Sequence, residues 1–167
     1  MLQMDEVFNV HHYTTHQLTM NLLCCFAGKF EVCPNGWSFL QGECFKNIES
    51  DTSMSWDKAR IQCKILGGDL ASVKDNETQN FLFTLLDPGI KKAWIGGRKI
   101  DGQWSWVDGT PFDWTEGWHR HQPSGDGSYM ELINWNSAEK GWNDLPSYTD
   151  QKRHILCKLG MEIWNTV

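Results

Sequence analysis

Four widely spaced cysteines restrict the fold of this chain more than any other feature of its sequence. Cys33 and Cys44 flank a predicted β-hairpin, because a turn at residues 41–43 brings the chain back on itself. We expect a disulfide there, and closing this small loop contributes on the order of 3 kcal/mol in the chain-entropy model. We also expect Cys63 to pair with Cys157 and to tie an early helix to the last strand. That longer loop is worth about 4–5 kcal/mol in the same model.

The remaining two cysteines, Cys24 and Cys25, are adjacent and poorly placed to pair with each other. They are removed with a leader, stay free, or link chains into a disulfide-bonded oligomer. Residues 22–28 resemble the end of a signal peptide's apolar core, but that core is short and no Lys or Arg precedes Lys29. Residues 1–32 are therefore an atypical signal remnant, an interaction tail or a disordered leader. Six cysteines fit an oxidising compartment, so we expect a secreted, extracellular protein.

Charge and hydropathy exclude two classes of partner. The net charge is −6 and there are no basic runs, which argues against non-specific electrostatic binding to nucleic acid. No apolar run approaches the roughly 20 residues that a membrane-spanning helix needs. Residues 76–78 form an N-glycosylation sequon, which matters in a secretory chain and predicts a glycoprotein.

The spacing of apolar residues predicts two helices within one domain at residues 33–160, followed by a short tail at 161–167. Ser55 is placed to cap the first helix, whose inward face carries Trp56, Ala59, Cys63 and Leu66, and Gly67 and Gly68 end it. Asp75 or Asn76 caps the second helix, with Phe81, Leu82 and Leu85 facing inward and Pro88 as the stop. Short strands are expected near residues 37–40, 44–45, 70–73, 93–97, 104–107, 130–134 and 154–158.

Residues 110–141 are mostly loop, apart from the strand near residue 130, and a loop of that length in a compact domain is usually functional. Two oxygen-rich segments lie here, at residues 122–126 and 142–144. Calcium takes about 6–8 oxygen ligands from carboxylates, amides and backbone carbonyls. Our central hypothesis is that the two segments come together as one calcium site.

A set of motifs in a fixed order gives this chain a family resemblance over about residues 33–159. The motifs are Cys33-Pro34-Asn35-Gly36-Trp37, Cys44-Phe45, the helix spacing of Trp56, Ala59 and Cys63, Leu70-Ala71-Ser72, Trp94-Ile95-Gly96, Trp104 and Trp106 with Asp108-Gly109, Trp118 with Gln122-Pro123, Trp142-Asn143-Asp144, and Ile155 with Cys157. In this order they resemble the C-type lectin domain.

The resemblance implies an α+β fold: two helices, two small antiparallel sheets and a long calcium-binding loop. It also implies a cis bond before Pro123, and a calcium ion that coordinates two neighbouring sugar hydroxyls. Carried onto this chain, the metal ligands are Gln122, Ser124, Asp126, Asn143 and Asp144. Strict counting along the strand puts Ser128 at the loop's acidic position, and Asp126 is preferred because this loop is short. The expected sugar-binding residues are Gln122, Ser124, Asn143, Asp144 and Trp118.

Two departures from the family pattern affect this site. Its sugar-selecting triplet is Gln-Pro-Ser, where the galactose-type triplet is Gln-Pro-Asp and the mannose-type is Glu-Pro-Asn; Gln122 therefore lies on the galactose side, and Ser124 matches neither. The family usually has a further disulfide, at positions that match Met130 and Ser147 here.

Trp118 packs on a galactose ring or forms part of the loop core, and the core role is preferred because tryptophan is usually buried. Tyr129 is a weaker candidate for sugar contact.

We therefore expect a non-enzymatic recognition module that binds galactose-type sugars through Ca²⁺, with a glycan or glycoprotein as its partner. The alternative is a calcium-independent, protein-binding C-type lectin-like domain, favoured by the Gln-Pro-Ser triplet and the missing disulfide. A zinc-dependent hydrolase using His119, His121 and His154 is the least favoured, because zinc needs about four ligands and a His-x-His pair is common by chance. No serine or cysteine lies in a nucleophile motif.

Overall fold

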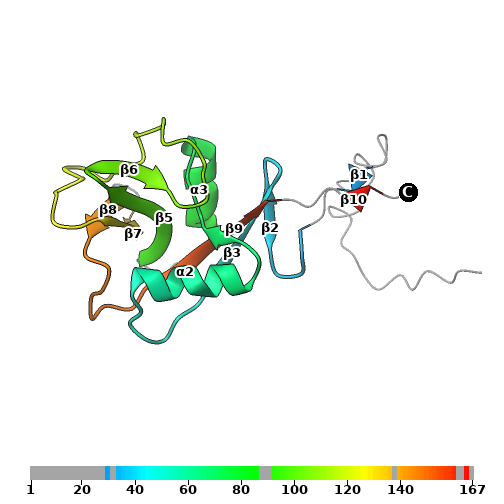
Figure 1. Cartoon of the computed structure of the whole chain (residues 1–167), viewed down its shortest axis with the longest axis horizontal. Coiled ribbons are helices and arrows are strands. Elements are labelled where there is room, and N and C mark those ends of the chain that lie inside the picture. Colours follow the sequence, from blue (N-terminus) through cyan, green and yellow to red (C-terminus); the bar gives the residue numbers. More distant parts are fainter. Residues whose placement is uncertain (1–28, 31–32, 87–91, 137–138, 161–163, 166–167) are drawn as a thin grey trace, which may run out of the picture. The chain divides into compact units, whose positions relative to one another are not determined.

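The structure, a computed structural model, describes residues 29–30, 33–86, 92–136, 139–160 and 164–165. The chain divides into two compact units, one over residues 33–161 and the other combining residues 1–32 with 162–167. In the second unit the segments expected to be tails pair as antiparallel strands, β1 (Lys29–Phe30) with β10 (Trp164–Asn165) (Figure 1). Cys24, Cys25 and the signal-like residues lie outside the described part of the chain. Within that part, none of the helices is both long and apolar enough to cross a bilayer.

Helix α2 (Trp56–Ile65) forms where the sequence predicts it, since Ser55 Oγ accepts a hydrogen bond from Lys58 N at its start. Its buried face carries Trp56, Ala59 and Cys63. Leu66, expected on the same face, is 42% exposed because the helix ends at Ile65 and Leu66 is its C-cap.

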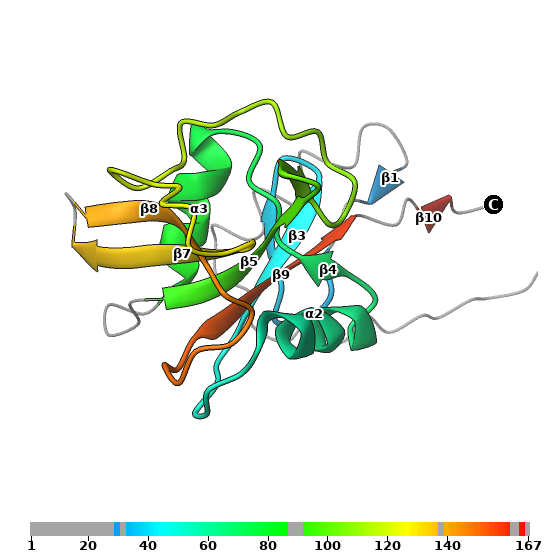
Figure 2. The same ribbon diagram turned by 60° about the vertical axis from the view of Figure 1, so that its left-hand side comes forward.

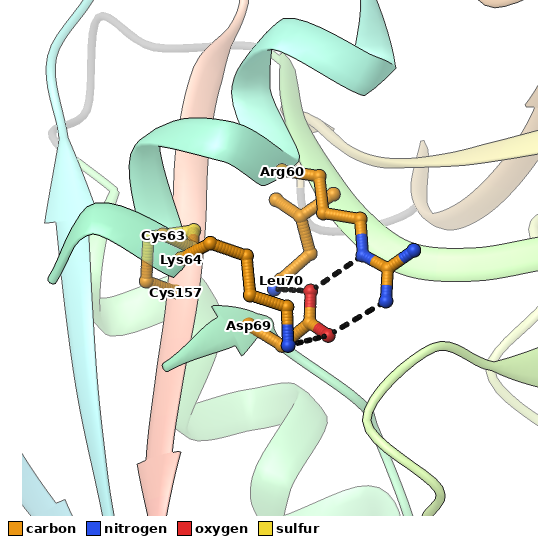
Figure 3. The surroundings of a disulfide bond; sticks show 6 residues. All are labelled: Arg60, Cys63, Lys64, Asp69, Leu70 and Cys157. Carbon is orange, nitrogen blue, oxygen red and sulfur yellow. Dashed lines mark hydrogen bonds and ion pairs between the residues drawn. A yellow bond between two sulfur atoms is a disulfide. The ribbon is translucent and has the colours of Figure 1, made fainter. Parts of the chain in front are cut away.

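Two links hold α2 to the strands behind it (Figure 3). The disulfide Cys63–Cys157 joins the helix to the last strand of the domain. Asp69, which is buried, accepts ion-pair contacts from Arg60 at 2.9 Å and from Lys64 at 2.9 Å. The other expected disulfide, Cys33–Cys44, is also present.

Helix α3 (Asn76–Leu85) is capped by Asp75, whose carboxylate accepts from Thr78 N at 2.7 Å. Leu82 is fully buried, while Phe81 and Leu85 are partly buried against the same core. In the sequon, Asn76 is exposed and Thr78 is buried. Pro88, the expected stop, lies outside the described residues.

Within the unit at residues 33–161, the described strands form one mixed sheet rather than the two small antiparallel sheets that the resemblance implied. Their order is β2 (Ser38–Leu40), β3 (Glu43–Ile48), β9 (His154–Gly160), β5 (Lys92–Ile100), β7 (Tyr129–Asn136) and β8 (Glu139–Leu145). Two short strands lie off this path: β4 (Asp69–Leu70) pairs with β9, and β6 (Gln103–Trp106) pairs with β5. Strands β2, β3 and β9 are joined to strands β5, β7 and β8 because β5 and β9 pair in parallel. Ala93 lies opposite His154, and Trp94 lies opposite Ile155.

Alternation along β9 places the two helices on opposite sides of it (Figure 2). Ile155 and Cys157 belong to the cluster that includes Trp56 of α2, while Leu156 belongs to the cluster that includes Leu82 of α3. This is the period-2 pattern of a strand buried on both faces. The hairpin of β7 and β8 carries the second oxygen-rich segment.

Candidate functional site

The long loop and β8 are held together by their backbones, which brings the two oxygen-rich segments into contact. His119 N donates to Trp142 O at 2.9 Å, and Trp142 N donates to Gly117 O at 2.8 Å. Further along, a Cβ on Gly127 would lie 1.8 Å from the carbonyl carbon of Leu145. Glycine is therefore required there, because any side chain would push the loop off the strand.

The peptide bond between Gln122 and Pro123 is cis, as the resemblance implied. Cis bonds are essentially confined to proline and mark specific turns. This turn starts the segment 122–126, whose side chains at Ser124 and Asp126 are exposed while Gln122 is half-buried.

Asp144 has both carboxylate oxygens bonded to the opposite segment. Its Oδ1 accepts from Ser124 N at 2.6 Å and from Ser124 Oγ at 3.1 Å, and its Oδ2 accepts from Gly125 N at 2.8 Å. The whole residue is 0% exposed. Asp144 thus fastens the loop to β8 through donors that belong to the protein.

The exposed part of the segment forms a small hydrogen-bonded group of its own. Gln122 Oε1 accepts from Ser124 N at 2.7 Å. Ser124 Oγ lies 2.8 Å from Asp126 Oδ1, so its single hydroxyl hydrogen is shared between Asp126 and the more distant Asp144. The structure therefore brings together four of the five expected ligand residues, Gln122, Ser124, Asp126 and Asp144.

Asn143, the fifth, has a different partner. In the pairing of β7 with β8 it lies opposite Glu131, and its Nδ2 donates to Glu131 Oε1 at 2.9 Å. The other carboxylate oxygen of Glu131 accepts from Arg153 Nε at 2.5 Å, and both charged side chains are buried. Arg153 also stacks over the ring of Trp94, with its guanidinium carbon 4.7 Å from the ring centroid.

Sequence reasoning missed Glu131 and Arg153. Glu131 carried a signal, because it is the one charged residue in the apolar run 130–135, and a charge in such a strand needs a partner. Arg153 carried none, since it lies 22 positions after Glu131 and only the fold brings the two residues together.

These bonds test whether the residues present fit a calcium ion, and in this arrangement they do not. Both oxygens of Asp144 point at amide donors, and Glu131 is neutralised by Arg153. Asp126 is the remaining carboxylate of the segment, whereas calcium takes about 6–8 oxygens. Across the described ranges, no group of three or more His, Cys, Asp or Glu side chains is arranged to hold a metal.

The aromatic candidates lie in packed clusters. Trp118 is half-buried, with its ring 5.1 Å from that of Trp104 and 5.6 Å from that of Trp142. This supports the core role for Trp118. Tyr129 packs against Trp56 with ring centroids 4.9 Å apart and the rings tilted by 48°, and Arg98 lies over the Tyr129 ring at 5.7 Å.

The three histidines have separate surroundings. His119 lies beside the ring of Trp135, with centroids 6.2 Å apart, and His121 is exposed. His154 is on β9, where its Nδ1 lies 3.1 Å from Asn47 Oδ1. This arrangement gives no support to a zinc centre.

A second polar cluster surrounds Lys158, away from the long loop. Its buried Nζ bonds to Glu43 at 2.8 Å, Asp108 at 2.6 Å, Ser72 at 2.6 Å and Thr110 at 3.0 Å. It lines an open pocket of about 530 Å³. Burial alone raises the pKa of Asp108, but hydrogen bonds from Lys158, the Thr110 amide and Ser72 bring that pKa below its ordinary value. The surrounding oxygens are enough to satisfy the three N–H donors of the ammonium.

Comparison with known proteins gives the family. The model of the Lectin C-type domain matches residues 52–159. The chain belongs to the C-type lectin domain family. This domain is 38% identical over 117 residues to the type-2 ice-structuring protein of Brachyopsis segaliensis, covering 69% of this chain and 66% of that protein. It is 32% identical over 130 residues to the galactose-specific lectin nattectin of Thalassophryne nattereri, covering 75% and 79%.

Among solved structures, the lectin domain resembles a calcium-independent type II antifreeze protein with a TM-score of 0.68 and 31% identity, over 80% of this chain and 98% of that one. Other curated lectins that it matches are longer, so that the chain spans between about a third and two thirds of their length.

Proposed function

We propose that this C-type lectin domain is a non-catalytic recognition module that binds a carbohydrate through the exposed polar groups of segment 122–126. The observation that carries the proposal is the grouping of Gln122, Ser124 and Asp126 on a turn whose backbone is fastened to β8 by Asp144. An amide, a hydroxyl and a carboxylate offer both donors and acceptors, which sugar hydroxyls require. A fixed backbone lowers the entropy lost on binding.

A galactose-type sugar is the preferred ligand within this proposal. Gln122 occupies the position that the family resemblance associates with galactose selection, and a relative at 32% identity is named for galactose. The calcium-dependent form of the hypothesis is weaker, because Asn143 and Asp144 would have to exchange their present partners for an ion. Direct hydrogen bonding to the sugar needs no such exchange.

Retention on galactose-agarose tests the proposal. We expect Gln122→Ala and Asp126→Ala to lose retention, because each removes a group at the turn surface. Gln103→Ala is the matched control, since Gln103 is an exposed residue on β6. Equal retention of all three variants, or no retention of the unaltered protein on any sugar matrix, would exclude carbohydrate binding by this segment.

A protein-binding module is the second candidate, and the outer face of α2 favours it. Ile61, Ile65 and Leu66 are 55%, 71% and 42% exposed and lie on adjacent turns. Contiguous exposed aliphatic side chains are typical of protein contact surfaces. Binding to a glycoprotein that survives enzymatic removal of its glycans, and that Ile65→Ser weakens, would favour this candidate over the first.

Ice is a further ligand class, because one relative is named an ice-structuring protein and the similar solved structure an antifreeze protein. Thermal hysteresis of the purified domain is the direct measurement.

We place the protein outside the cell, since both described disulfides need an oxidising compartment to form.

A further inference from the structure

We propose that Asp144 acts as an internal clamp in place of a metal ion, so that the ligand loop is closed without calcium. This inference rests on the proposed function only in taking segment 122–126 as the ligand site. It assigns to Asp144 a role different from the metal ligand that the resemblance implied. The geometry of the clamp comes from three donors on one side and one carboxylate on the other.

The direction of the hydrogen bonds is the first argument. A carboxylate that serves a metal turns at least one oxygen toward the ion. Here Oδ1 of Asp144 receives the Ser124 amide at 2.6 Å and Oδ2 receives the Gly125 amide at 2.8 Å. Two successive backbone N–H groups pointing at one anion form the kind of concave anion site that backbone nests provide.

Burial is the second argument. Asp144 is 0% exposed, and a buried carboxylate is tolerated only when its charge is compensated by donors. Turning it toward an ion would take the acceptor away from the Gly125 amide and leave the Ser124 amide with Gln122 Oε1 alone. The present state therefore competes directly with metal binding.

The neighbouring residue gives the third argument. Asn143 donates to Glu131, and Glu131 is neutralised by Arg153 rather than by an ion. The positive charge that holds this part of the site together is thus a guanidinium of the chain itself. Close backbone contact between Gly127 and Leu145 also holds the loop against β8 without an ion.

Thermal unfolding in the presence of calcium or EDTA tests the clamp without any sugar. We expect the melting temperatures to agree within about 1 °C at about 10 mM calcium, a concentration above the dissociation constants of extracellular calcium modules. A calcium-dependent rise of several degrees would overturn the inference, because an ion that binds only the folded state must stabilise it.

Amide hydrogen exchange in EDTA gives an independent readout. We expect the Ser124 and Gly125 amides to be protected in the unaltered protein. The Gly125 amide should exchange at least about tenfold faster in Asp144→Asn, which keeps the shape of the side chain but loses its charge and one acceptor oxygen, while the Ser124 amide keeps Gln122 Oε1 as an acceptor. Asp126→Asn is the control and should leave both amides protected, because Asp126 is bonded to the Ser124 hydroxyl and not to either amide.

Unprotected amides in the unaltered protein would overturn the clamp even if Asp144→Asn failed to fold. A protein that shows both protected amides and calcium-insensitive melting but binds no sugar would retain the clamp and lose the proposed function. The two ideas therefore fail separately.

Discussion

Arg153 and Glu131 form a buried ion pair with Nε and Oε2 2.5 Å apart, directly behind the hairpin residue Asn143. Arg153 also bonds the hydroxyl of Thr149 and the carbonyl of Gln151. Pairs of this kind often contribute little net stability, because two charges lose their hydration, yet removing one partner strands the other. The pair thus fixes the position of Asn143 more than it adds to the stability of the fold.

Arg153→Met should destabilise the domain by about 3–5 kcal/mol, since it leaves the Glu131 carboxylate buried and unpaired. The double variant Arg153→Met with Glu131→Gln should recover part of that loss, because the amide is neutral. Urea unfolding of the two variants measures the difference. Equal stability of the single and double variants would show that Glu131 is not the stranded group.

Gly127→Ala should separate the loop from β8, because the added Cβ would lie 1.8 Å from the backbone of Leu145. We expect faster proteolysis of the loop and a loss of stability in the upper part of the usual range for single substitutions, about 2–3 kcal/mol. Gly160→Ala is the control, as a Cβ there meets nothing within 4 Å. Similar protease resistance of the two variants would contradict the close contact.

The lowered pKa of Asp108 predicts acid sensitivity. A group whose pKa is lower in the folded state contributes stability above its unfolded pKa, about 3.9, and that contribution is lost as the pH falls through the folded pKa. Asp108→Asn should therefore flatten the decline of unfolding free energy below about pH 4. Asp69 and Asp75, whose pKa values are also lowered, leave part of the slope in place.

The two disulfides should differ in what their removal costs. Cys63 and Cys157 are separated by 94 positions and Cys33 and Cys44 by 11. In the chain-entropy model these loops are worth about 4–5 and about 3 kcal/mol. Replacing each pair by alanine and measuring denaturant unfolding should show the larger loss for Cys63 with Cys157. The opposite order would mean that loop length does not determine how much each disulfide lowers the entropy of the unfolded chain.

The sequence predicted those parts of the fold that depend on neighbours along the chain. Ser55 and Asp75 cap their helices because a cap is set by the three residues that follow it. The segments at 122–126 and 142–144 were predicted to meet, and they do. The sequence could not predict which groups pair with one another where the segments meet. The partners of Asp144 and Glu131 depend on strand register and on the path of a distant loop. The parallel pairing of β5 and β9, which merges the sheets, is non-local for the same reason.

Met130 and Ser147 occupy the positions where the family usually has a third cross-link. Met130 is buried in the core, and the carbonyl of Ser147 accepts from Trp56 N at 2.7 Å, so packing and one backbone bond hold this end. The two disulfides in the described part of the chain lie elsewhere: one joins Cys33 to β3, and the other joins α2 to β9. Dithiothreitol therefore has no disulfide to reduce within segment 122–126 or within the β7–β8 hairpin. A loss of ligand binding in the presence of dithiothreitol would therefore report unfolding of the rest of the domain rather than a change within segment 122–126.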